Sequence, residues 1–146
     1  MKRDGAVALL RRELGREENA RFGRLYGKRR PVKAATISLV LLACGSGAYN
    51  VSTVPLVAEG NRIAPARFDR MESGWENVQP VLINAGWDEA TASLSSFAKA
   101  RGLGDCGTAQ TYVWDGAMFR LVEQSEMGEC RGSTDYITTW RAAVRR

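Results

Sequence analysis

The sequence contains no histidine among its 146 residues. Catalytic systems of the Ser-His-Asp and Cys-His types are therefore excluded, and so are zinc sites with histidine ligands. The three cysteines are too few for an ordinary structural zinc site, so we expect neither a metal nor another cofactor. No apolar run approaches the ~20 residues that a membrane-spanning helix needs, so we expect no transmembrane segment.

Charge is distributed unevenly along a chain that is long enough for one compact domain. Residues 1–34 contain 11 Lys/Arg and 4 Asp/Glu, whereas the rest of the chain contains 10 and 12. We therefore divide the chain into a basic, partly helical arm (1–34) and a β-rich domain (35–146). Such an arm can contact nucleic acid, anionic lipid or an acidic protein. We favour a solvated lead-in, and we expect no nucleic-acid partner because the domain has no base-stacking motif.

The three cysteines are Cys44, Cys106 and Cys130. Cys106 and Cys130 flank a predicted hairpin, and a bridge between them would contribute on the order of 3–4 kcal/mol through loop-closure entropy. Two free, buried thiols are the alternative. We favour a disulfide that fastens the β-rich domain, and therefore an oxidising compartment. This predicts a periplasmic or envelope-associated protein, although no export signal is evident in the chain.

The apolar segment before Cys44 has two interpretations. The chain has a basic stretch, then ten apolar or small residues, and then a cysteine. This order resembles a bacterial lipoprotein signal. However, Ile37, Leu39 and Leu41 alternate as in a buried strand, which is the interpretation that we favour.

The pattern of apolar residues predicts a mainly β fold, α+β overall. We expect an antiparallel sheet or small sandwich with short N-terminal helices and a short C-terminal helix. The predicted helices are Ala6–Leu14, Glu17–Tyr26 and a segment within 135–144, where Trp140 should pack on the sheet. The predicted strands are Thr36–Ala43, Tyr49–Val57, Arg62–Phe68, Val78–Ile83, Thr91–Ala98, Thr108–Trp114 and Ala117–Glu123, with a two-residue hairpin turn at Gly60-Asn61.

The strongest turn signal is Asp115-Gly116, which follows Trp114 and favours a two-residue type I′ hairpin. This turn would pair Trp114 with Ala117, Tyr112 with Phe119 and Gln110 with Leu121. We expect this aromatic face to point toward the core.

Five stretches of the sequence together resemble a known family. They are "LVLLACGSGAYN", "LSSFAKARGLGDCG", "YVWDGAMFRLVE", "ECRG" and "TTWRA". From about Ile37 to Ala142, they resemble the C-terminal part of the proteobacterial domain of unknown function 1176 family. The resemblance implies an exported, periplasmic protein without an assigned activity, and a chain that corresponds to the C-terminal part of a longer architecture. Family members carry a cysteine shortly before Gly-Ala-Tyr-Asn, which fits Cys44 and supports the strand.

Catalysis would have to rely on carboxylates. The candidates are Asp69, Glu72, Glu76, Asp88, Glu89, Asp105 and Asp115, and no two of them show a glycosidase-like spacing. Turn chemistry explains Asp115, and Asp105 is suited to bonding the local backbone.

A binding surface is the other possibility, and its candidate residues are Arg101, Asp105, Arg120 and Arg131. Arg141 also flanks the aromatic hairpin and the loop between the two cysteines. If they converge, they could hold an anionic glycan, a phosphate or an acidic partner. The alternative is that these arginines are solvated residues at the rim or pair with Glu123 and Glu126. We therefore predict a non-catalytic envelope domain that binds or supports another envelope component. The competing hypotheses are a carboxylate-dependent enzyme acting on a small molecule or sugar, and binding of an anionic polymer through the arm.

Overall fold

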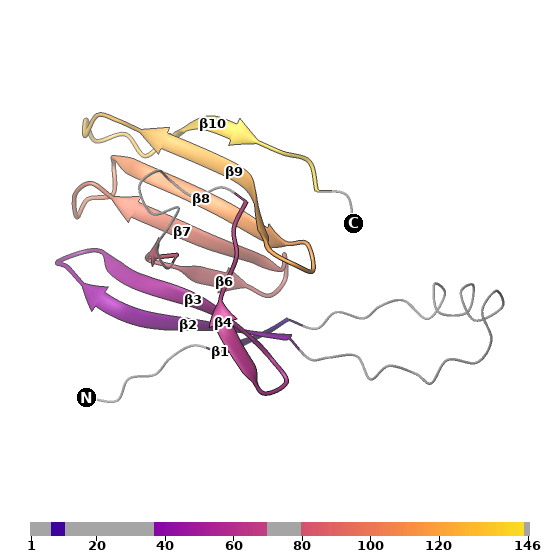
Figure 1. Cartoon of the computed structure of the whole chain (residues 1–146). Helices are drawn as coiled ribbons and strands as arrows, with labels where there is room; N and C mark the ends of the chain where they lie inside the picture. The colour runs from indigo at the N-terminus through magenta and orange to yellow at the C-terminus, as the bar shows by residue number, and fades with distance from the viewer. Residues whose placement is uncertain (1–6, 11–36, 70–79, 145–146) are drawn as a thin grey trace, which may run out of the picture.

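The computed structural model describes residues 7–10, 37–69 and 80–144, which form two antiparallel five-stranded sheets and no helix (Figure 1). The first sheet has the order β1-β2-β3-β4, and β5 also pairs with β3. Its strands are β1 (Val7–Leu10), β2 (Ile37–Ser46), β3 (Val51–Glu59), β4 (Arg62–Pro65) and β5 (Leu82–Ile83).

The second sheet is a meander with the order β10-β9-β8-β7-β6. Its strands are β6 (Gly86–Asp88), β7 (Ser93–Lys99), β8 (Gly107–Trp114), β9 (Phe119–Met127) and β10 (Ile137–Arg141). In this sheet, short connections between consecutive strands explain why every pair is antiparallel.

Side chains from both sheets form one shared core. Leu39 and Leu41 of β2 and Leu94 of β7 are buried together with Tyr112 and Phe119. The alternation of apolar residues on β2 and β8 points these side chains inward, as the sequence predicted. The mainly β fold class and its antiparallel sheets are thus confirmed.

A connecting segment, residues 66–69, joins the two sheets. It leaves β4 and rises across the second sheet (Figure 1). The amide of Phe119 donates to the carbonyl of Arg67 at 2.8 Å, and the amide of Asp69 donates to the carbonyl of Phe119 at 3.1 Å. The Phe68 ring lies 5.0 Å from that of Tyr112 and 5.2 Å from that of Phe119. The segment therefore closes one side of the core.

Two helix predictions are wrong. Within Ala6–Leu14, Val7–Leu10 is a strand that pairs with β2. The predicted C-terminal helix is instead β10, which pairs with the edge of β9. Its Ile-Thr-Thr-Trp sequence is rich in β-branched and aromatic residues, and the available strand edge outweighs its helical spacing. The third predicted helix, Glu17–Tyr26, lies outside the described residues.

The hairpin β8–β9 has the predicted inward face but not the predicted register. Trp114 pairs with Phe119 and Tyr112 with Leu121, two positions away from the expected partners. The connection is a four-residue loop, residues 115–118, because the side chain of Asp115 bonds the backbone inside it. A shift of two residues leaves every side chain on the same face, so the aromatic face still points inward.

The two-residue turn at Gly60-Asn61 is confirmed, because Glu59 pairs with Arg62 across it. The backbone of Gly60 has a φ of 59°, which glycine adopts readily.

Gly107 provides a stability test of the pairing between β7 and β8. Its φ is 139°, and an added Cβ would lie 2.1 Å from the carbonyl oxygen of Ala98. Gly107→Ala should therefore lower the free energy of unfolding by about 2–4 kcal/mol in urea titrations. Gly128→Ala is the matched control, because nothing lies within 4 Å of its added Cβ. Equal stability of the two variants would contradict this account.

Candidate functional site

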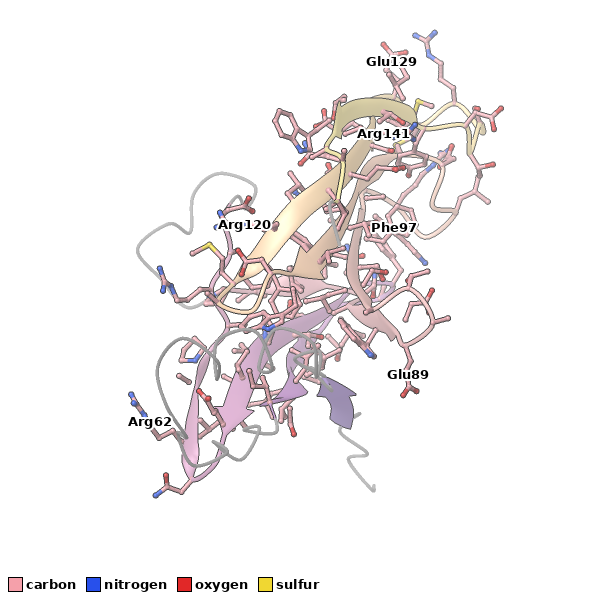
Figure 2. All side chains as sticks on the ribbon, turned by 90° about the vertical axis from the view of Figure 1, so that its right-hand side faces the viewer. Arg62, Glu89, Phe97, Arg120, Glu129 and Arg141 are labelled. Atoms are coloured by element: carbon pink, nitrogen blue, oxygen red, sulfur yellow. A yellow bond between two sulfur atoms is a disulfide. The ribbon has the colours of Figure 1, made fainter. Side chains whose placement is uncertain are left out.

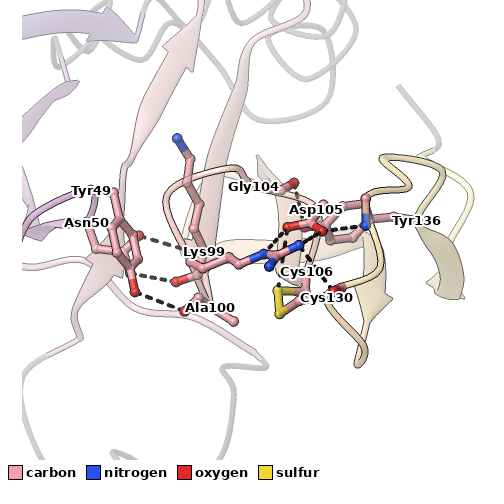
Figure 3. The surroundings of a disulfide bond; sticks show 11 residues. Tyr49, Asn50, Lys99, Ala100, Gly104, Asp105, Cys106, Cys130 and Tyr136 are labelled. Atoms are coloured by element: carbon pink, nitrogen blue, oxygen red, sulfur yellow. Dashed lines mark hydrogen bonds and ion pairs between the residues drawn. A yellow bond between two sulfur atoms is a disulfide. The ribbon is translucent and has the colours of Figure 1, made fainter.

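A disulfide joins two loops at one end of the second sheet (Figure 3). Cys106 lies just before β8 and Cys130 follows β9, with their Cα atoms 4.8 Å apart. Cys106 has no exposed surface. We call the two loops that the bridge connects, residues 100–106 and 128–136, the disulfide corner.

The centre of the disulfide corner is the carboxylate of Asp105, which is fully buried. Nε of Arg101 donates to its Oδ1 at 2.7 Å, and Nη2 of Arg101 donates to its Oδ2. The amide of Gly132 donates to Oδ2 at 2.6 Å. Nη2 of Arg101 also donates to the carbonyl of Cys130 at 3.1 Å. The forked guanidinium thus connects the two loops directly through the carbonyl of Cys130. It also connects them indirectly, because it holds the Asp105 carboxylate that accepts the Gly132 amide.

These contacts determine the ionisation of Asp105. The hydrogen bond from Arg101 lowers the pKa of Asp105 to about 2, assisted by the Gly132 amide and opposed by burial. The same hydrogen bond raises the pKa of Arg101. A carboxylate that is ionised at neutral pH and already bonded is poorly suited to general acid–base catalysis.

Asp105, Cys106 and Cys130 bring three potential metal-ligand atoms within 4.8 Å of one another. The two sulfurs are bonded to each other, however, and only a thiolate is a good metal ligand. The oxygens of Asp105 are bonded to Arg101 and Gly132. The donor set of the oxidised chain therefore fits a structural clamp better than a metal centre.

The turn between β2 and β3 contacts the disulfide corner (Figure 3). The hydroxyl of Tyr49 donates to the carbonyl of Ala100 at 2.9 Å, and Nδ2 of Asn50 donates to the carbonyl of Lys99 at 2.8 Å. Nδ2 of Asn84 donates to Oδ1 of Asn50 at 2.9 Å. These hydrogen bonds connect the first sheet to the end of β7.

Sequence reasoning missed Tyr49, Asn50 and Asn84 as structural residues. The φ of Asn84 is 47°, a left-handed conformation that asparagine adopts more easily than most residues. The "GAYN" stretch was recognised only as part of the family resemblance. Because its partners lie about 50 residues away in the chain, no local pattern could have identified the contact.

Tyr136 packs on the other side of the same loop. Its hydroxyl donates to the carbonyl of Gly104 at 3.1 Å, and its ring lies edge-on to that of Phe97 at 5.7 Å. The three stretches "ARGLGDCG", "ECRG" and "GAYN" therefore meet at one end of the molecule.

The candidate arginines do not form one cluster. Arg101 and Arg131 belong to the disulfide corner, and Nη2 of Arg131 lies 2.5 Å from a carboxylate oxygen of Glu129. Arg141 on β10 pairs with Glu123 at 3.2 Å. Figure 2 shows Arg120 well away from Arg141 and Glu129.

Arg120 is the second residue of β9 and lies beside the 115–118 loop, at the opposite end of the second sheet. Its Nε donates to Oδ2 of Asp115 at 2.7 Å, and its Nη1 lies 3.8 Å from Oδ2 of Asp69. Every candidate arginine thus has a carboxylate neighbour, as expected for pairing rather than for a shared anion site.

Trp114 ends β8, and Asp115 and Gly116 begin the loop between β8 and β9. Oδ1 of Asp115 accepts the amides of Ala117 at 2.7 Å and Met118 at 2.8 Å. Burial alone would raise the pKa of Asp115, but these amides and Arg120 outweigh it and lower the pKa. Gly116 has a φ of 103°, and the Trp114 ring packs edge-on against Phe119 at 5.0 Å.

Cys44 and Trp140 lie on strands away from the disulfide. Cys44 is exposed and free on β2, in agreement with the strand interpretation of its segment. Trp140 lies on β10, and its Nε1 donates to the carbonyl of Leu121 at 3.3 Å.

Comparisons with known proteins identify relatives of this chain. A family model described as "Protein of unknown function (DUF1176)" matches residues 28–143. The Escherichia coli (strain K12) protein named "Uncharacterized protein YpfG" is 31% identical over 110 residues, which cover 70% of this chain and 32% of that protein. The match thus spans about a third of the relative's length. No solved structure matches. None of the described residues forms a helix long and apolar enough to cross a membrane.

Asp105 gives a stability prediction with a defined pH dependence. Its pKa in the folded state, about 2, lies below the ~3.9 of an unfolded aspartate, so its stabilising contribution is present above about pH 4. The contribution should disappear as the pH falls from about 4 to 2. In Asp105→Asn, the urea midpoint at pH 7 should fall, because Arg101 loses its counter-charge, and the midpoint should depend less on pH in this range.

Asp135→Asn is the matched control, because Asp135 is an exposed aspartate in the same corner. It should leave the urea midpoint at pH 7 unchanged. If Asp105→Asn retains both the wild-type midpoint and its full acid dependence, the assignment of Asp105 as the buried clamp is wrong.

Proposed function

This chain belongs to the DUF1176 family, and on that premise we propose that it is a non-catalytic domain of the cell envelope that binds or supports another envelope component. The observation that carries the proposal is the Cys106–Cys130 disulfide beside the buried carboxylate of Asp105, which pairs with the partly exposed Arg101. Disulfides persist in oxidising compartments such as the bacterial periplasm and are rare in the cytosol. The disulfide therefore supports a periplasmic location.

The states of the carboxylates support a role without catalysis. A general acid at neutral pH needs a raised pKa, yet the pKa values of Asp88, Asp105 and Asp115 are all lowered. Each of the three bonds nearby backbone amides, as in a turn or clamp. Glu72 and Glu76 lie outside the described residues.

The enzyme hypothesis would be favoured by two close, buried carboxylates. Asp69 and Asp115 both lie near Arg120, but a guanidinium stands between them and both remain partly exposed. The Arg120 guanidinium favours the ionised form of Asp115, which is the opposite of what a general acid requires. Binding of an anionic polymer through residues 1–34 stays a prediction from charge, because most of this arm lies outside the described residues.

Periplasmic export tests the proposal directly. The chain is expressed behind a cleavable secretion signal, free thiols are alkylated on lysis, and peptides are mapped with and without reduction. We expect one linked peptide pair, Cys106 with Cys130, and alkylated Cys44. A bridge that contains Cys44, or three alkylated thiols, would contradict it. Cys44→Ser is the control and should leave the bridge intact.

Removing the bridge should also reduce stability. Cys106→Ser/Cys130→Ser should lower the free energy of unfolding by about 3 kcal/mol, because the unfolded chain gains the freedom of a loop of about 25 residues. Urea titration of the exported double variant against exported Cys44→Ser measures this loss. Equal midpoints would show that the crosslink does not stabilise the domain.

A further inference from the structure

The face of the second sheet that points toward the core is apolar at one end and more polar at the other. Near the 115–118 loop it carries the core residues Tyr112 and Leu121, which pair across β8 and β9. Directly opposed residues of antiparallel strands share a face. The next two rows toward the disulfide corner are therefore Gln110, Gln124 and Trp140, and then Thr108, Glu126 and Ile137.

These two rows become more exposed toward the edge strand. Gln110 on β8 is only 8% exposed, whereas Trp140 and Ile137 on β10 are 38% and 67% exposed. The core residues thus give way to a mixed polar and aromatic surface on the same face. We call this surface, formed by Gln110, Gln124, Glu126, Thr139 and Trp140, the Trp140 ledge.

Hydrogen bonds order the polar side chains of the ledge. Nε2 of Gln110 donates to Oε1 of Gln124 at 2.8 Å, and Nε2 of Gln124 donates to Oε1 of Glu126 at 2.5 Å. The hydroxyl of Thr139 donates to the same oxygen of Glu126 at 3.2 Å. The two amides and the carboxylate are therefore held in one orientation before any ligand arrives, which reduces the entropy lost on binding.

Trp140 is held in the same way. Its Nε1 donates to the carbonyl of Leu121, so the indole is anchored to β9 while over a third of its surface stays exposed. A partly exposed aromatic ring with a fixed orientation is a typical anchor of a binding surface.

The charge of the ledge limits the ligand. Among the described residues, no cation lies within ion-pair distance of Glu126. Arg141 follows Trp140 in the strand, pairs with Glu123 and belongs to the opposite face. An anionic ligand would therefore meet a carboxylate without a compensating charge. An apolar partner would bury the amides and the carboxylate at a cost.

From this surface we propose that the Trp140 ledge binds an uncharged oligosaccharide of pyranose sugars. A pyranose ring offers an apolar C–H face to the indole and neighbouring hydroxyls to the planar amides, which donate and accept hydrogen bonds, and to the carboxylate, which accepts them. Strands about 4.8 Å apart repeat such groups across β8, β9 and β10 at a spacing similar to the length of one sugar. The proposal rests on the proposed envelope-binding function and names a glycan as the component bound.

Calorimetric titration of the full chain tests the proposal. The uncharged probes are hexa-N-acetylchitohexaose and cellohexaose, and the anionic comparison is hexagalacturonate. We expect at least one uncharged hexamer to bind and hexagalacturonate to bind more weakly. Trp140→Ala should raise the Kd about tenfold because the stacking surface is lost, and Trp140→Phe should raise it only about threefold because a ring remains. Gln124→Ala should also weaken binding.

Leu103→Ala is the matched control, because Leu103 is a 69% exposed apolar residue in the disulfide corner, outside the ledge. It should leave the Kd unchanged. The proposal is overturned if neither uncharged hexamer binds, if Trp140→Ala binds as tightly as the wild type, or if hexagalacturonate binds best. Peptide mapping of each variant confirms that Cys106–Cys130 has formed.

The two proposals fail in different ways. If the exported chain has its disulfide but binds neither uncharged hexamer, only the ledge proposal fails. If the exported chain has three free thiols, the envelope function fails whatever the titrations show.

Discussion

The carboxylate of Asp105 is ionised and has no exposed surface, so the chain must surround it with donors. Those donors come from two loops far apart in sequence, Arg101 from one and the Gly132 amide from the other. Satisfying one buried charge therefore positions the loop before β8 against the loop after β9. The disulfide forms where these loops meet, and the covalent bond and the ion pair stabilise the same arrangement. Removing Arg101 would leave the buried carboxylate of Asp105 without its cation, which explains why the arrangement of these loops depends on this contact.

The disulfide corner also determines where β10 begins. The chain leaves Cys130, passes Gly132 and Tyr136 and enters β10 along the edge of β9. Because Trp140 lies on this strand, the corner indirectly sets the row in which the indole faces Gln124. The proposed envelope function and the proposed glycan surface therefore depend on neighbouring parts of one structure. The first depends on the covalent bond, and the second on the strand register that follows it.

Local signals in the sequence identified strands better than their partners. The alternation around Leu39 and Leu41 and the aromatic alternation around Tyr112 predicted both the strands and their inward faces. The register of β8–β9 was wrong by two residues, because the side chain of Asp115 closes a longer loop than the turn rule assumes. A further irregularity between Thr111 and Tyr112 shifts the pairing again. The inward face survived because side chains alternate with a period of two, whereas the choice of partner depends on the loop.

The sequence by itself determined the antiparallel β class, the apolar strands of the core, the pairing partners Cys106 and Cys130, and the family resemblance. These follow from residue type and local periodicity. Only the tertiary structure decided that Val7–Leu10 and Ile137–Arg141 are strands, because short segments with apolar residues at helical spacing adopt β structure when a strand edge is available. Contacts between distant segments of the chain likewise decide two other features. One is the Asp105 carboxylate that bonds both Arg101 and Gly132, and the other is the row that joins Gln110 to Trp140. No local pattern encodes such contacts, since each requires loops and strand registers that are established only when the sheets form.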